Sequence, residues 1–234
     1  MRLAVMQPYL FPYLGYFQLI SKVDRFVFYD NVSYIKQGWV NRNRLLVDGE
    51  PRYFTVPVSK ASSHRNICDT KVSPDYYPGW RRKFRRMVQY EYSTAEHLNT
   101  ALSLIDEVLV PEPLNIGWLA ERSVRATCAL LGISVEMTVS SSDHPASELS
   151  GTERLLEICV SLGADEYLNS PGGRHLYDGN EFAVEGIDLL FLDPQLDSYD
   201  QPGSEFVGGL SVLDIICRAG PAHAAHAVQS ASLG

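Results

Sequence analysis

Short apolar runs alternate with helical segments along most of this chain, and each run ends in a polar or glycine-containing loop. The runs at residues 3–6, 24–30, 134–139, 166–169 and 187–192 have the length of strands, whereas the segments between them repeat apolar residues at helical spacing. Strands joined by helices lie parallel, because each crossover returns the chain to the same end of the sheet. The alternation therefore predicts an α/β fold with a mainly parallel sheet in three layers, flanked by helices.

The middle of the chain departs from this alternation. Consecutive helical segments without an intervening strand predict a helical subregion at about residues 76–131. A chain of 234 residues can form one large α/β domain, which we place at residues 1–220. Residues 221–234, rich in Ala, Ser and His, are expected to form a flexible C-terminal tail.

Charge is divided unevenly along the chain. Residues 1–92 contain 15 Lys and Arg against 7 Asp and Glu, whereas residues 93–234 contain 5 against 21. An anionic ligand is therefore expected on the first part. The net charge of −8 and the lack of a continuous basic stripe argue against a nucleic acid partner.

Other broad classes of function are disfavoured. No apolar run approaches the roughly 20 residues of a membrane span, and the first residues do not resemble a signal peptide, so a cytoplasmic protein without a membrane partner is expected. The 4 cysteines lie far apart and the histidines show no metal-ligand spacing. We therefore expect neither a metal nor a cofactor.

The segment at residues 6–17 holds two prolines, one glycine and five aromatic rings. Each proline fixes its own φ and extends the residue before it, which predicts a stiff crossover from the first strand to the first helix. Such strand–turn–helix junctions hold anionic ligands in α/β proteins. Gln7 and Tyr9 are thus candidate substrate-binding residues, and Asp30, at the end of the next strand, is a candidate catalytic group beside them.

Cationic, amide and indole groups are mixed at residues 34–44, with almost no hydrophobic period. Arginine offers a forked donor for phosphate or carboxylate, lysine a point charge, and tryptophan a stacking face. The alternative is an edge strand whose arginines face water. The candidate substrate-binding residues here are Lys36, Trp39, Asn41, Arg42 and Arg44.

A glycine turn at residues 169–173 follows a strand and precedes a helical pattern, so its backbone N–H groups could bind an anion or a carbonyl oxygen. The alternative is a plain tight turn. Around it we identify Asn169 and His175 as candidate catalytic residues, and Gly172, Gly173 and Tyr177 as candidate binding residues. Tyr199 and Gln201, in a later polar aromatic loop, complete the candidate binding set.

Several of these segments together resemble the WbqC-like family. The resemblance covers nearly the whole chain, and its most specific part is the N-terminal block Met6-Gln7-Pro8-Tyr9-Leu10-Phe11-Pro12-Tyr13-Leu14-Gly15-Tyr16-Phe17-Gln18-Leu19-Ile20. The other matching segments are Phe28-Tyr29-Asp30-Asn31-Val32, Gly38 to Arg44, Pro171-Gly172-Gly173 with Tyr177, and Phe206 followed by Leu210-Ser211-Val212-Leu213-Asp214. The family is associated with bacterial O-antigen and other glycan loci and with specialised-metabolite clusters.

The resemblance implies a biosynthetic enzyme that modifies an activated small molecule, by acyl or aminoacyl transfer to an amine such as an amino sugar. The expected partner is a small-molecule substrate that carries a phosphate or a carboxylate, namely a nucleotide sugar, an acyl-CoA or a carrier-bound acyl group. In the last case an acyl carrier protein would be a further partner. In this hypothesis Asp30 orients or deprotonates the amine, while Asn169 and the Gly172 and Gly173 amides stabilise an oxyanion.

Two other functions stay open. One is nucleotide-dependent adenylyl transfer or ligation, suggested by a fold-level likeness to nucleotidyltransferases. In those enzymes an H-x-G-H motif follows the first strand, and here the corresponding stretch is Tyr13-Leu14-Gly15-Tyr16, which keeps the glycine and lacks both histidines. The other is a non-catalytic sugar-binding or scaffold protein of a biosynthetic complex.

Overall fold

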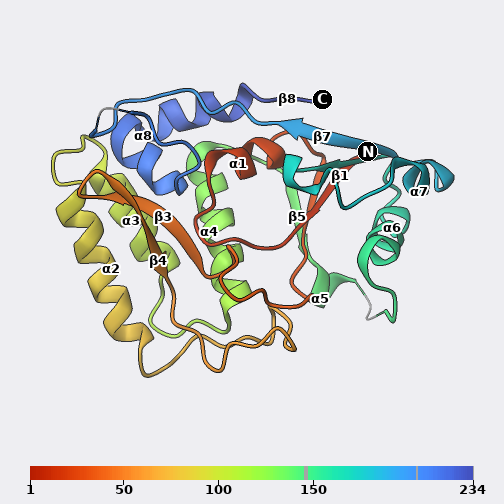
Figure 1. Cartoon of the computed structure of the whole chain (residues 1–234), viewed down its shortest axis with the longest axis horizontal. Coiled ribbons are helices and arrows are strands. Elements are labelled where there is room, and N and C mark those ends of the chain that lie inside the picture. The colour runs from red at the N-terminus through yellow and green to blue at the C-terminus, as the bar shows by residue number, and fades with distance from the viewer. Residues whose placement is uncertain (145–146, 204, 234) are drawn as a thin grey trace.

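A mostly parallel sheet forms the centre of the computed structural model, which describes residues 1–144, 147–203 and 205–233 (Figure 1). In this part of the chain the sheet has six strands in the order β5-β2-β1-β6-β7-β8, and only β8 runs antiparallel to its neighbour. The strands are β1 (Arg2–Met6), β2 (Arg25–Phe28), β5 (Glu136–Val139), β6 (Glu166–Asn169), β7 (Asp188–Asp193) and β8 (Ser232–Leu233). The expected mainly parallel α/β fold is confirmed.

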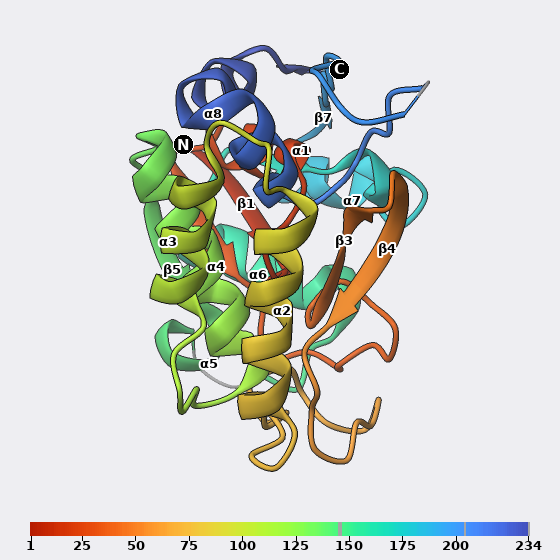
Figure 2. The same ribbon diagram turned by 90° about the vertical axis from the view of Figure 1, so that its left-hand side faces the viewer.

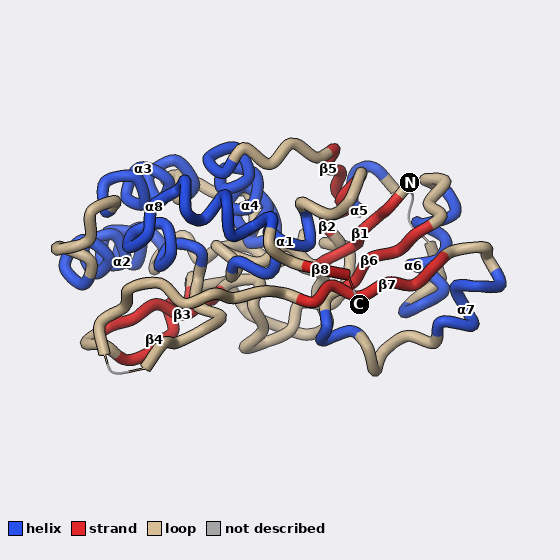
Figure 3. Tube along the Cα trace, turned by 90° about the horizontal axis from the view of Figure 1, so that it is seen from above, coloured by secondary structure: helices blue, strands red, loops and turns tan. Residues whose placement is uncertain are grey.

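Helices cover both faces of this sheet, as Figure 3 shows. Alternate side chains of β1 supply the two interfaces: Ala4 belongs to the larger apolar cluster, while Leu3 and Val5 belong to the smaller one. The larger cluster is covered by α1 (Leu14–Ile20), α4 (Ile116–Leu131) and α8 (Val212–Gln229). The smaller is covered by α6 (Gly151–Ser161) and α7 (Gly179–Val184).

The expected helical subregion consists of α2 (Tyr77–Glu91), α3 (Leu98–Val108) and α4. Beside it lies a separate antiparallel hairpin of β3 (Arg42–Val47) and β4 (Glu50–Thr55), which α2 flanks in Figure 2. The rings of Phe54 and Phe84 join hairpin and helix at 4.6 Å between centroids. None of the helices in the described part of the chain combines the length and the apolar character needed to cross a membrane.

Two local expectations differ from the structure. The segment expected as a tail continues α8 after a break at Gly220 and then forms β8, because Ala224, Ala227 and Val228 pack into the core. The loop expected after β5 begins with the short helix α5 (Ser140–Asp143).

Candidate functional site

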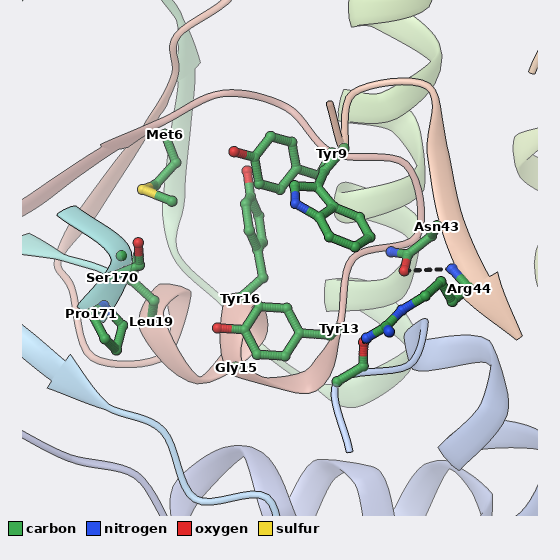
Figure 4. Close-up of a pocket in the computed structure, with 13 residues that line it drawn as sticks. Met6, Tyr9, Tyr13, Gly15, Tyr16, Leu19, Asn43, Arg44, Ser170 and Pro171 are labelled. Carbon is green, nitrogen blue, oxygen red and sulfur yellow. Dashed lines mark hydrogen bonds between the residues drawn. The ribbon is translucent and has the colours of Figure 1, made fainter. Parts of the chain in front are cut away.

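The chain reverses its direction of winding at β1. From β1 it moves to β2 and β5 on one side, and it later returns to β6 and β7 on the other. In open α/β sheets ligands bind outside the carboxyl ends of the strands at such a switch point. A cavity of about 380 Å³ lies there, between the segments that follow β1 and β6 and the hairpin strand β3 (Figure 4). Its lining residues are Met6, Tyr9, Tyr13, Gly15, Tyr16, Leu19, Trp39, Asn43, Arg44, Ser170, Pro171, Gly172 and Gly209.

The segment after β1 is held in a strained conformation. Phe11 is fully buried and has a φ of 41°, in the left-handed region that bulky side chains rarely adopt. Three elements hold its backbone: its N–H donates to Ser123 Oγ at 2.9 Å, and its carbonyl accepts from Asn43 Nδ2 and Ser211 Oγ, each at 2.8 Å. These bonds fix the path that carries Tyr9 and Tyr13 to the cavity.

Tyrosine rings form one wall of the cavity. The rings of Tyr9 and Tyr16 lie 5.6 Å apart, and Tyr16 Oη donates to the carbonyl oxygen of Gln7 at 2.8 Å. The ring of Tyr13 lies over Gly15, where a Cβ atom would come within 2.4 Å of it. Burial raises the pKa of Tyr9, Tyr13 and Tyr16 above the ordinary 10.0, so near neutral pH these hydroxyls are uncharged.

Arg44 brings a positive charge to the opposite wall. Its backbone N–H donates to Asn43 Oδ1 at 2.8 Å, and one guanidinium nitrogen, Nη2, reaches the carbonyl of Gly209 at 3.4 Å (Figure 4). The guanidinium carbon lies 5.9 Å from the ring centroid of Trp39. Its Nε is buried with no hydrogen-bond partner, and no ion pair to this side chain occurs among residues 1–144, 147–203 and 205–233. The charge is therefore available to a bound anion.

The glycine turn after β6 closes the third side. Asn169 is buried, and its Oδ1 accepts from the Ser170 N–H at 2.7 Å. Its amide also lies against Gly173, where a Cβ atom would meet Nδ2 at 2.8 Å. The turn is therefore packed by the Asn169 side chain, and Gly172, at its edge, lines the cavity. Burial raises the pKa of nearby Tyr177, whose ring contacts Phe182 at 5.9 Å.

Four of the candidate residues from the sequence meet in this cavity, namely Tyr9, Trp39, Arg44 and Gly172. Gln7 instead lines a neighbouring cavity with Asn31, beyond the end of β2. Lys36 and His175 are exposed to solvent, and Asn41 is buried, with its Nδ2 donating to Val56 O at 2.8 Å. The other candidate binding residues are absent from the lining of this cavity: Arg42, Gly173, Tyr177, Tyr199 and Gln201.

Asp30 follows the end of β2, and both oxygens of its carboxylate accept hydrogen bonds. Oδ1 accepts from Ser140 Oγ at 3.0 Å and from the Ser141 N–H at 2.9 Å, while Oδ2 accepts from Ser141 Oγ at 2.6 Å. The residue is only 7% exposed and is absent from the lining of the main cavity. It joins the end of β2 to the start of α5.

Tyr199 and Gln201 also contact a buried carboxylate. Asp214, in the first turn of α8, is fully buried, and its Oδ2 accepts from Tyr199 Oη at 2.6 Å and from Gln201 Nε2 at 3.0 Å. Its Oδ1 accepts from Tyr92 Oη at 2.5 Å and from Arg218 Nε at 3.3 Å. Gln201 in turn binds both backbone groups of Val207, two residues before Gly209. The network therefore anchors the segment that lines the cavity near Arg44.

Sequence reasoning missed Tyr13, Tyr16, Asn43 and Ser170 as lining residues. Two of them lie in the aromatic segment that had been singled out, but its spacing does not show which rings face a cavity. The described residues contain no group of three or more His, Cys, Asp or Glu side chains placed to hold a metal ion.

Comparison with known proteins gives a family but no activity. The model of the WbqC-like protein family matches residues 7–226. An uncharacterised protein of Mycobacterium tuberculosis, Rv1507c, is 30% identical over 222 residues, which cover 94% of each chain. No solved structure matches the chain. Because the family model matches nearly the whole chain, including the segments that form the cavity from Gln7 onward, the chain belongs to the WbqC-like protein family.

Proposed function

We propose that this chain is a small-molecule transferase that passes an acyl or aminoacyl group to an amine and forms an amide. One observation carries the proposal: a guanidinium without an ion-pair partner, that of Arg44, faces an aromatic cavity at the switch point of the sheet. A phosphate or carboxylate of the substrate would bind Arg44, and its sugar or other less polar part would lie among Tyr9, Tyr13 and Trp39.

The chemistry of the lining favours direct transfer. The lining residues include no carboxylate, imidazole or thiol, and Ser170 is the only aliphatic hydroxyl among them. An unprotonated amine needs no strong base, because its lone pair attacks the carbonyl carbon of an activated donor directly. The bond from that carbon to the leaving group then breaks, and the proton lost by the amine passes to the leaving group or to water. N–H and O–H donors at Gly172 and Ser170 would stabilise the oxyanion.

The structure suggests a positioning role for two candidate catalytic residues. Asp30 has both carboxylate oxygens bonded to Ser140 and Ser141, so we propose that it orders the end of β2 and does not remove a proton. Asn169 packs against Gly173 and would hold the turn that presents Gly172. His175 is exposed and stays a candidate only if a substrate extends beyond the cavity.

Adenylyl transfer is the second candidate, and the strand order favours it. In chain order, the five parallel strands lie as 3-2-1-4-5, which forms part of the 3-2-1-4-5-6 order of dinucleotide-binding folds. This candidate predicts that ATP binds and that diphosphate is released when an acceptor is added. Amide formation predicts instead a product whose mass equals that of the acceptor plus the acyl group minus one hydrogen atom.

Arg44→Gln provides the test of the proposed site. Purified protein would be screened by thermal shift with nucleotide sugars, ATP and acyl-CoA, and then assayed by mass spectrometry with donor and amine pairs. We expect the substitution to lower ligand affinity roughly tenfold or more, as for loss of a charge-assisted hydrogen bond. Arg52→Gln removes the same charge from an exposed position on β4 and serves as the control. Equal binding by the Arg44→Gln variant would refute the role of this cavity.

A further inference from the structure

Two neighbouring aromatic rings with a guanidinium group at each end form a row that runs from the cavity across the hairpin. We call the side chains of Arg44, Trp39, Tyr53 and Arg42 the hairpin ladder. Arg44 lies 5.9 Å from the Trp39 ring, Trp39 and Tyr53 are 6.1 Å apart, and the Arg42 guanidinium carbon lies 4.4 Å from the Tyr53 ring. Arg42 and Arg44 are two residues apart on β3, so they share one face at a spacing of about 7 Å.

The ladder has unused binding capacity. Tyr53 is 53% exposed and Trp39 37% exposed, although both are large rings. The Nε atoms of Arg42 and Arg44 are buried without hydrogen-bond partners, and neither side chain forms an ion pair within the described ranges. Two uncompensated guanidinium groups beside exposed rings favour a ligand that is both anionic and planar.

We infer that the hairpin ladder binds the nucleoside diphosphate part of a nucleotide-linked substrate, whose remaining group enters the cavity. This inference rests on the proposed function and names its substrate class. The two guanidinium groups would bind the two phosphates in a forked geometry, and the base would stack on the exposed ring surface of Tyr53 and Trp39.

Other ligands use only part of this surface. A neutral carbohydrate could stack on the rings but would leave both guanidinium groups unpaired, and inorganic phosphate would leave the rings uncovered. A nucleic acid strand needs a basic surface that continues along its backbone, whereas this chain has a net charge of −8. A nucleoside diphosphate satisfies all four side chains.

The position of Arg44 sets the orientation of the ligand. Arg44 belongs both to the ladder and to the cavity lining, so the phosphate that it binds marks the entrance. The group attached to that phosphate would then lie among Tyr9, Tyr13 and Ser170. In a sugar nucleotide this group is the sugar, which places an amine of the sugar inside the cavity as the acyl acceptor.

Titration calorimetry with UDP, ADP and inorganic pyrophosphate separates the two parts of the ladder. We expect Tyr53→Ala to lower the affinity for UDP and ADP about tenfold and to leave pyrophosphate within about twofold, because only the nucleosides stack. Arg42→Gln should weaken all three about tenfold. The controls are Tyr90→Ala, which removes another exposed tyrosine, on α2, and Arg52→Gln, which removes an exposed arginine on β4.

The outcomes distinguish this inference from the proposed function. If UDP and ADP bind no better than pyrophosphate and Tyr53→Ala has no effect, the nucleoside assignment is overturned. Binding of pyrophosphate or acyl-CoA that still depends on Arg44 would then leave the proposed cavity in place. If Arg44→Gln changes the binding of none of these ligands, both are overturned. Thermal unfolding of each variant confirms that the hairpin is intact.

Discussion

Asp214→Ala should destabilise this protein more than removal of any other single carboxylate considered above. The side chain is fully buried and accepts hydrogen bonds from Tyr92, Tyr199, Gln201 and Arg218. Truncation leaves several buried donors unpaired, and each unpaired neutral donor costs about 1–3 kcal/mol. Because some of these groups can turn toward water, we expect a net loss of about 3–5 kcal/mol in the free energy of unfolding. For a chain of this length that corresponds to a fall in Tm of roughly 6–20 °C.

Urea unfolding followed by tryptophan fluorescence and circular dichroism measures this loss. Asp200→Ala, an exposed aspartate beside the network, is the control and should shift the free energy of unfolding by less than about 0.5 kcal/mol. Tyr92→Phe should cost about 1–2 kcal/mol, because its hydroxyl also accepts from the Leu46 N–H of β3. If Asp214→Ala unfolded at the same urea concentration as the control, the buried network around Asp214 would not contribute to stability as argued.

Three further predictions concern the cavity and the core. Gly15→Ala should displace the Tyr13 ring, because the new Cβ atom would lie 2.4 Å from that ring. Ligand affinity should therefore fall, while Tm changes by only a few degrees. Unchanged affinity would show that the ring moves aside freely. Asp30→Ala should lower the free energy of unfolding, measured in urea, by about 2–4 kcal/mol, because it leaves the donors of Ser140 and Ser141 unpaired. We expect the folded fraction of this variant to turn over at the wild-type rate, and a loss of turnover would show instead that Asp30 acts as a base. Burial raises the pKa of the Cys128, Cys159 and Cys217 thiols from 9.0 to about 12, so the unfolded chain loses these protons at lower pH than the folded chain does. The free energy of unfolding should therefore stay constant below about pH 9 and fall between about pH 9 and 12, and urea midpoints that stay constant up to about pH 10.5 would contradict this.

Local signals in the sequence are enough to predict the parallel strands and mark the ends of helices. Gly132 ends α4 in the left-handed conformation, with a φ of 69°, and Ser211 caps α8 through its side chain; glycine and serine are the residue types that favour these two positions. Parallel pairing of β1 and β2 follows from their separation by a single helix. These features depend on neighbours within a few residues, which is why composition and spacing reveal them.

The lining of the cavity depends on contacts that no local pattern encodes. The run at residues 24–30 indicates that Asp30 lies close to a strand end, but its partners Ser140 and Ser141 are about 110 residues away in the sequence. Asn43 had no assigned role, and the structure shows its amide bonded to the Phe11 carbonyl. In a parallel sheet each strand end meets loops from distant parts of the chain, so the choice of partner appears only in three dimensions.

The strained segment after β1 explains why the candidate site needs support from so many elements. Phe11 adopts a left-handed conformation that costs about 1–3 kcal/mol, and the hydrogen bonds from Asn43 and Ser211 and to Ser123 offset that cost. The hairpin, α4 and α8 must all be in place before the tyrosine wall can form. Because Asn43 adjoins Arg44, the same hairpin that stabilises the wall also delivers the guanidinium opposite it. A shift of the hairpin would therefore disturb both sides of the cavity together, which couples the binding of an anion at Arg44 to the order of the aromatic segment.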